Sequence, residues 1–179
     1  MHLTKDEVLK ELERLQHDFE EKKVEVKCLE SREEFDIGGK KIKLQKGSIL
    51  QIPFWIAYIL HKESLVEYDF LKKFNLSSVH FLTEKEKAKK ALQPIDPFFY
   101  IIAKKSIEEF KEQKTISFRE LEILEIELRE LMTLRLNKVI NMSTKSKNIT
   151  STIRNLTVEE KWLYDIVADA VEKWKIMVG

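Results

Sequence analysis

The sequence contains few of the residues that hold metals or form disulfides. Cys28 is the single cysteine in 179 residues, so neither an intramolecular disulfide nor a cysteine-based zinc site can form. The four histidines (His2, His17, His61 and His80) are scattered without the spacing of metal ligands. We therefore expect no metal and no cofactor, with each histidine at the surface or at the edge of the core.

A long hydrophobic run is also lacking. The longest apolar stretch, residues 52–60, is far short of the roughly 20 residues that a membrane-spanning helix needs. The first residues are charged and include no apolar segment typical of a signal peptide. We therefore expect a cytoplasmic protein without a membrane-bound part.

Neither sign of charge predominates. Lys and Arg number 32 and Asp and Glu 31, which gives a formal net charge of +1. Proteins that coat nucleic acid usually carry a basic excess, because their affinity comes from neutralising phosphates. With 43% hydrophobic and 35% charged residues, and only four glycines and three prolines, the composition is typical of a globular and largely helical protein.

The first 52 residues predict one helix followed by a small β-rich unit. Thr4 and Glu7 have the spacing of a capping box, and apolar residues follow at helical intervals. The pattern then changes to strict alternation, and Gly38-Gly39 suits the positive φ angles of a tight hairpin turn. A sheet within residues 22–52 is too small to be stable alone, so it should pack against helices.

From Pro53 onward the sequence predicts helices and no strand. The expected helices cover approximately residues 53–60, 64–74, 84–93, 97–110, 118–140 and 158–177. Capping-box pairs precede three of them: Thr83 with Glu86, Ser117 with Glu120, and Thr157 with Glu160. Residues 142–156 are polar and predict a loop. The predicted fold class is α+β, mainly α, with a small β-rich domain at 1–52 and a helical bundle domain at 53–179.

The long helix at 118–140 is apolar on two faces. One face carries an ordinary core stripe, which consists of Leu121, Leu124, Leu128, Leu131, Met132 and Val139. Ile123, Ile126 and Leu134 lie on the opposite side, among charged residues. Either the helix is central to its own bundle, or its second face docks on another subunit.

The last helix has the same excess of apolar residues. Large apolar side chains spread over about half of its circumference when the helix is drawn at 100° per residue. Trp and Tyr are enriched where association energy concentrates. Trp162, Tyr164 and Trp174 are therefore candidate contact residues, although burial within the bundle explains Trp162 equally well.

Signatures of catalysis are missing. Phosphate binding has no platform, because no glycine-rich loop follows a predicted strand. Acidic pairs fall at helix starts or on charged faces, where capping or solvation explains them. Nothing resembles a Ser/His/Asp or Cys/His constellation. We expect that the protein is not an enzyme.

Two segments resemble the subunits of the GINS replication complex. The first contains Gly47, Pro53, Trp55, Ala57 and Leu60, and is similar to the family pattern G-x-x-L-x-[VL]-P-x-W-[LI]-A-x-x-L where the small B domain joins the helical A domain. Phe54 departs mildly from it. The second contains Arg135 and Lys138 followed by a polar loop and residues 156–164. It is similar to L-R-x-x-K-[IV] … L-T-x-E-E at the end of the A domain.

The resemblance implies a partner set and a mechanical role. Because the β unit comes first, the chain is similar to the archaeal subunit with the B domain first. Two copies would join two copies of an A-domain-first sister in a heterotetramer. That tetramer would bind the MCM helicase and a RecJ-like protein, and would stabilise the helicase while MCM hydrolyses ATP.

The motif residues also have structural interpretations. Pro53 would end the sheet and begin a helix, and Trp55 and Leu60 would cover the apolar face of the β unit. Arg135 lies within the main apolar stripe of its helix, so its burial requires a carboxylate partner. That carboxylate could come from this chain or from the sister subunit.

A different class of function competes with this one. A β-hairpin carrying Lys40, Lys41, Lys43 and Lys46 could contact phosphates in a helical nucleic-acid-binding protein. Alternating lysines on one strand are more often a solvated face. A hydrolase with convergent carboxylates is a third alternative, and no motif supports it.

Overall fold

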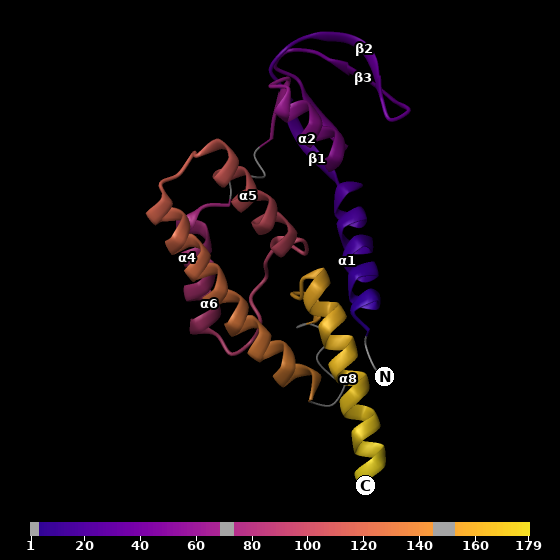
Figure 1. The fold of residues 1–179 in the computed structure, drawn as a ribbon, viewed down its shortest axis with the longest axis vertical. Helices are drawn as coiled ribbons and strands as arrows, with labels where there is room; N and C mark the ends of the chain where they lie inside the picture. Colours follow the sequence, from indigo (N-terminus) through magenta and orange to yellow (C-terminus); the bar gives the residue numbers. More distant parts are fainter. Residues whose placement is uncertain (1–3, 69–73, 145–152) are drawn as a thin grey trace. The chain divides into compact units, whose positions relative to one another are not determined.

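The computed structural model describes residues 4–68, 74–144 and 153–179 (Figure 1). The chain forms two compact units, which divide between residues 73 and 74. A small β-rich unit precedes a helical unit, so the predicted α+β, mainly α fold class is confirmed.

In its described part, residues 4–68, the first unit contains one long helix, two sheets and a short helix. Helix α1 (Lys5–Glu20) begins at the predicted capping box of Thr4 and Glu7. Strands β4 (Ile49–Pro53), β1 (Lys23–Cys28) and β5 (Val66–Glu67) form an antiparallel sheet in that order. Strands β2 (Arg32–Ile37) and β3 (Lys40–Leu44) form a separate hairpin. Inward residues of β1 and β3 are buried in the core of this unit, and so is Phe19 of α1.

The hairpin turn is the predicted one. Gly38 and Gly39 both have positive φ angles, +58° and +79°, which residues with side chains rarely adopt. At Gly38 there is no room for a side chain either, because an added Cβ would lie 2.7 Å from Cη2 of Trp55. The turn therefore depends on glycine for both its backbone angles and its contact with Trp55.

Helix α2 (Phe54–Lys62) packs on the sheet through Phe54, Ile56, Ala57 and Leu60, all of them buried. Pro53 is the last residue of β4 and the N-cap of α2, one position before its predicted place at the start of the helix. The predicted domain boundary after residue 52 falls within this unit, because α2 and β5 both pack against β1.

The prediction of a helix over residues 64–74 is wrong for its first part. Residues 66 and 67 form β5, which pairs with Lys27 and Cys28 of β1. A two-residue strand leaves no alternating pattern in the sequence, so it escaped detection. Residues 69–73 of the predicted helix lie outside the described residues.

Within its described residues the second unit contains four helices: α4 (Leu76–Ala88), α5 (Phe99–Gln113), α6 (Phe118–Ser143) and α8 (Val158–Val178). Helices α4 and α6 lie side by side, and α8 packs on α6 (Figure 1). The hydroxyl of Ser117 and that of Thr157 accept hydrogen bonds at the predicted starts of α6 and α8. Both helices begin where predicted. The full capping box forms at Thr157 and Glu160, whereas at the start of α6 the described contact is the hydrogen bond that Ser117 accepts from the backbone of Glu120.

The predicted capping box at Thr83 and Glu86 is wrong. Both residues are buried within α4, which begins seven residues earlier than Thr83 at a capping box of Asn75 and Ser78. The Thr83 hydroxyl donates a hydrogen bond to the carbonyl oxygen of Val79, as hydroxyls inside helices do. Glu86 has a different role, which the polar network below explains.

Candidate functional site

Arg135 lies at the centre of the helical unit. Its side chain is 0% exposed, and it stands one turn after Leu131 and one turn before Val139 on the buried face of α6. A buried guanidinium group is costly unless its charge is balanced and each N–H group has an acceptor. The surroundings of Arg135 meet both conditions.

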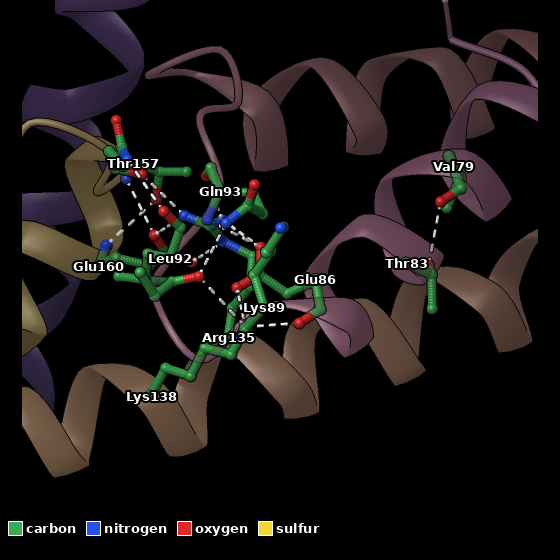
Figure 2. A network of polar contacts seen from close by, with 12 residues as sticks. Val79, Thr83, Glu86, Lys89, Leu92, Gln93, Arg135, Lys138, Thr157 and Glu160 are labelled. Carbon is green, nitrogen blue, oxygen red and sulfur yellow. Dashed lines mark hydrogen bonds and ion pairs between the residues drawn. The ribbon is translucent and has the colours of Figure 1, made fainter. Parts of the chain in front are cut away.

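The five N–H donors of Arg135 all find acceptors within the described chain (Figure 2). Nε and Nη2 donate to the two carboxylate oxygens of Glu160, at 2.7 and 2.8 Å. Nη1 donates to Oε2 of Glu86 at 3.0 Å. The remaining two hydrogen bonds go to the backbone carbonyls of Gln93 and Asn155. The carboxylates that the sequence required for Arg135 thus come from this chain.

Lys138 lies next to Arg135 in the network and binds the end of α4. Its Nζ donates to Oε1 of Glu86 at 2.6 Å, and to the backbone carbonyls of Glu86 and Lys89 at 2.6 and 2.7 Å. The last carbonyl groups of a helix have no partner within the helix. Lys138 therefore supplies hydrogen bonds and positive charge where the α4 dipole is negative.

Glu160 connects the network to the start of α8. It accepts a hydrogen bond from the backbone N–H of Thr157 at 3.0 Å, which completes the capping box, and one from the Tyr100 hydroxyl at 2.6 Å. Burial opposes ionisation of Glu160, but the hydrogen bonds and charge of Arg135 outweigh it and hold its pKa below the ordinary value. Burial and the charge of Glu160 raise the pKa of the Tyr100 hydroxyl. Glu160 is therefore an anion and Tyr100 a neutral donor.

The network is neutral, since Arg135 and Lys138 balance Glu86 and Glu160. It joins α4, α6 and α8 (Figure 2). Through Glu160 it also reaches the hydroxyl of Tyr100 in α5. Buried ion pairs add little net stability compared with apolar packing, but they require one particular arrangement of the elements that carry them. The network can therefore fix the position of α8 against α4 and α6.

A large part of the apolar surface of α6 and α8 is exposed. Of the predicted contact residues, Ile126 is 61% and Trp174 59% exposed, and Ile123 is also exposed. Leu134 and Tyr164 are half-buried, and Tyr164 packs beside the buried cluster of Leu92, Val139 and Leu156. The alternative that α6 is sealed within its own bundle therefore does not hold for Ile123 and Ile126.

Sequence reasoning missed a second exposed row on α6. Met132, Leu136 and Ile140 are all exposed and follow each other at intervals of four residues, so they lie on one face of the helix. Met132 was expected in the core because it belongs to the predicted core stripe, although it lies at the edge of that stripe. The spacing of the three residues could have revealed the row. The last turn of α8 adds further exposed apolar residues: Ile176, Met177 and Val178.

Residues 73–179 match the family model described as Sld5, the GINS complex protein helical bundle domain. The match covers more than half of the chain and begins where the second compact unit begins. The chain belongs to the GINS family. It is therefore a GINS complex subunit of DNA replication, which works in a complex with other GINS subunits, and no catalytic family is indicated. No curated protein sequence matches the chain.

The residues of the first GINS-like motif lie in the β-rich unit. Gly47 has a φ angle of +83° in the turn before β4. The indole Nε1 of Trp55 donates a hydrogen bond to Oε1 of Glu21 at 3.0 Å, and the ring covers the turn at Gly38. Ala57 and Leu60 are buried in the face that α2 presents to the sheet. These residues hold the β-rich unit together.

Two of the four hairpin lysines pair with acidic neighbours. Lys40 pairs with Glu21 at 3.3 Å and lies over the Trp55 ring, and Lys41 pairs with Glu34 at 3.4 Å. A phosphate-binding hairpin would present unopposed positive charge, so the pairing of Lys40 and Lys41 weakens the nucleic-acid alternative.

Two further classes of site receive no support from the described chain. Within residues 4–68, 74–144 and 153–179, no group of three or more histidine, cysteine, aspartate or glutamate side chains could hold a metal ion. Among the helices described here, none combines the length and the apolar composition that crossing a membrane requires.

Proposed function

We propose that this chain is the B-domain-first subunit of an archaeal GINS complex. In this proposal two copies join two copies of an A-domain-first sister subunit in a cytoplasmic heterotetramer. The tetramer binds the MCM helicase and a RecJ-like protein and stabilises the active helicase. The chain itself performs no chemistry, needs no cofactor and contacts nucleic acid weakly or not at all.

The observation that carries the proposal is the exposed apolar surface of α6 and α8, in the same unit that matches the GINS helical bundle. Monomeric proteins rarely expose contiguous apolar patches of this kind, and such patches mark interaction sites. Ile123, Ile126, Leu134, Tyr164 and Trp174 are the residues we assign to the subunit interface. Trp and Tyr are favoured at such positions because they provide large apolar contacts at low entropic cost.

The order of the two units supports the choice of subunit type. The β-rich unit comes first and the matched helical bundle second. The first motif, from Gly47 to Leu60, lies in the β-rich unit, and the second, around Arg135, lies in the bundle. This is the arrangement that the resemblance to the B-domain-first subunit implies.

The polar network supports a mechanical role. A clamp must present its contact surface in one fixed geometry, and the network around Arg135 connects the helices that carry this surface. Because the network is buried and all five Arg135 donors are engaged, its groups are occupied in holding helices together. A stable scaffold for protein contacts follows from this arrangement.

A reconstituted helicase assay tests the proposal. The co-purified complex of this chain and its sister should bind MCM and the RecJ-like protein in a pull-down experiment, and should increase DNA unwinding by MCM. The chain should show no ATPase or nuclease activity of its own. Unwinding that does not change when the complex is added, together with no binding to either protein, would contradict the proposal.

A further inference from the structure

An apolar groove lies among α5, α6 and α8. One hollow of about 550 Å³ is lined by residues of all three helices, and a second of about 390 Å³ lies between α5 and α6. Tyr100 and Met132 line both hollows, so the two form one continuous groove. Leu136 and Leu163 continue its apolar lining toward α8.

Glu159 lies at the α8 end of this groove, and one of its carboxylate oxygens lacks a hydrogen-bond donor within the described chain. Its Oε2 is buried and has no hydrogen-bond partner within the described chain. Burial raises the pKa of the Glu159 carboxyl, and hydrogen bonds with Thr157 and the backbone offset this only in part. The neighbouring Glu160 differs sharply, because Arg135 and Tyr100 occupy both of its oxygens.

Two arginines near Glu159 pair with other groups. Arg129 also lines the hollow, but its guanidinium group is largely exposed and pairs with Glu125 at 3.5 Å. Arg135 has all five donors engaged elsewhere, as described above. A buried carboxylate oxygen without a donor costs free energy, so a cation from outside the chain would find a favourable position here.

We propose that this groove receives a helix of the sister GINS subunit, and that a Lys or Arg among the apolar residues of that helix pairs with Glu159. This inference rests on the proposed function, which provides the partner. The apolar lining contributed by three helices suits an amphipathic helix, whose apolar side chains follow each other along one face. Charge complementarity at Glu159 fixes the register of that helix and discriminates against chains that lack the basic residue.

Two opposite effects of one substitution test this pairing. Glu159→Gln keeps the shape of the side chain and removes its charge. In the isolated chain it should raise the melting temperature, because an unfavourably buried charge disappears. In the complex it should weaken binding of the sister subunit by about tenfold or more, because the partner's cation loses its carboxylate. A merely structural role of Glu159 would move both measurements in the same direction.

Asp165→Asn on the exposed part of α8 provides the matched control and should change neither quantity appreciably. Glu159→Lys should abolish binding, and one Lys→Glu or Arg→Glu substitution on the sister should restore it. Isothermal titration calorimetry at moderate salt measures each pair.

The outcomes separate this inference from the proposed function. If the wild-type chain does not bind the sister subunit, the proposed function fails. If wild-type binding is tight and Glu159→Gln binds equally well, the function stands and the pairing is overturned. A third outcome is that Glu159→Gln loses self-association but binds the sister subunit normally. This result would also overturn the pairing, because it would place a second copy of this chain in the groove.

Discussion

Arg135 and Glu160 form a two-pronged ion pair across the helical bundle, with N–O distances of 2.7 and 2.8 Å. The same carboxylate completes the capping box at Thr157, so one side chain both begins α8 and attaches it to α6. The start of α8 and its attachment to α6 therefore share one side chain. If α8 carries part of the subunit interface, this contact also determines the geometry of assembly.

Replacement of Arg135 should strongly destabilise the helical unit. Arg135→Ala leaves Glu86 and Glu160 buried without their principal cation, and breaking a buried pair in this way costs about 3–5 kcal/mol. Urea unfolding followed by circular dichroism measures the loss. Arg129→Ala, on the exposed side of the same helix, should change the free energy of unfolding by less than about 0.5 kcal/mol. Equal effects of the two substitutions would contradict the role assigned to Arg135.

The folded protein should become less stable at acidic pH because of Glu160. Its pKa in the folded protein is below the ordinary value of 4.5, so the unfolded state binds more protons in this range. The stabilisation is complete above about pH 4.5 and disappears as the pH falls through the lowered pKa. Melting temperatures between pH 7 and pH 3 should show this loss.

Two glutamine variants assign the acid effect to a residue. Glu160→Gln should be less stable at pH 7 and should have a shallower decrease toward pH 3. Glu159→Gln should show a steeper decrease than the wild type, because the pKa of Glu159 is raised and the variant lacks the stabilisation that its protonation gives the folded wild type in acid. Identical pH profiles for wild type and Glu160→Gln would rule out this assignment.

The two hairpin glycines should respond differently to alanine. Both have positive φ angles, so each substitution costs about 1 kcal/mol from backbone strain alone. At Gly38 the new Cβ would also collide with Trp55, whereas at Gly39 nothing lies within 4 Å. Gly38→Ala should therefore destabilise the first unit by about 1 kcal/mol more than Gly39→Ala. Equal losses in thermal unfolding would show that Trp55 does not press on the turn.

DNA binding by the isolated chain should be weak and insensitive to the hairpin. Lys43 and Lys46 are exposed, and their combined replacement by alanine should leave the affinity for duplex DNA almost unchanged. Fluorescence anisotropy at several salt concentrations measures the affinity and its salt dependence. Tight binding that falls steeply with salt and is lost in the double variant would favour the nucleic-acid alternative.

The sequence predicted most of the local structure, since caps, turns and periodic apolar residues leave local signals. Thr4, Thr157 and the two hairpin glycines all act as their motifs indicate. The capping box at Thr83 was wrong because Glu86 is acidic for a different reason: it balances Arg135 and Lys138. Such pairings join residues that are about 50 positions apart, and nothing in one sequence shows which acid faces which base.

The same limit applies to the candidate site. The position of Arg135 in an apolar stripe indicated that a carboxylate must lie nearby, but only the fold shows that Glu86 and Glu160 provide it. Met132 was expected in the core because helical periodicity does not show where neighbouring helices leave a groove. Glu159 and Glu160 are adjacent and look equivalent in the sequence, yet only Glu160 faces Arg135.

The mass of the assembly, measured by light scattering on the co-expressed chain and sister subunit, tests the central claim most directly. The wild-type pair should elute as a tetramer with two copies of each chain. Ile126→Glu should prevent or weaken this assembly, whereas Ile49→Glu in the first unit should not, although both isoleucines are similarly exposed, at 61% and 68%. A stable, soluble monomer of this chain that ignores its sister would contradict the account.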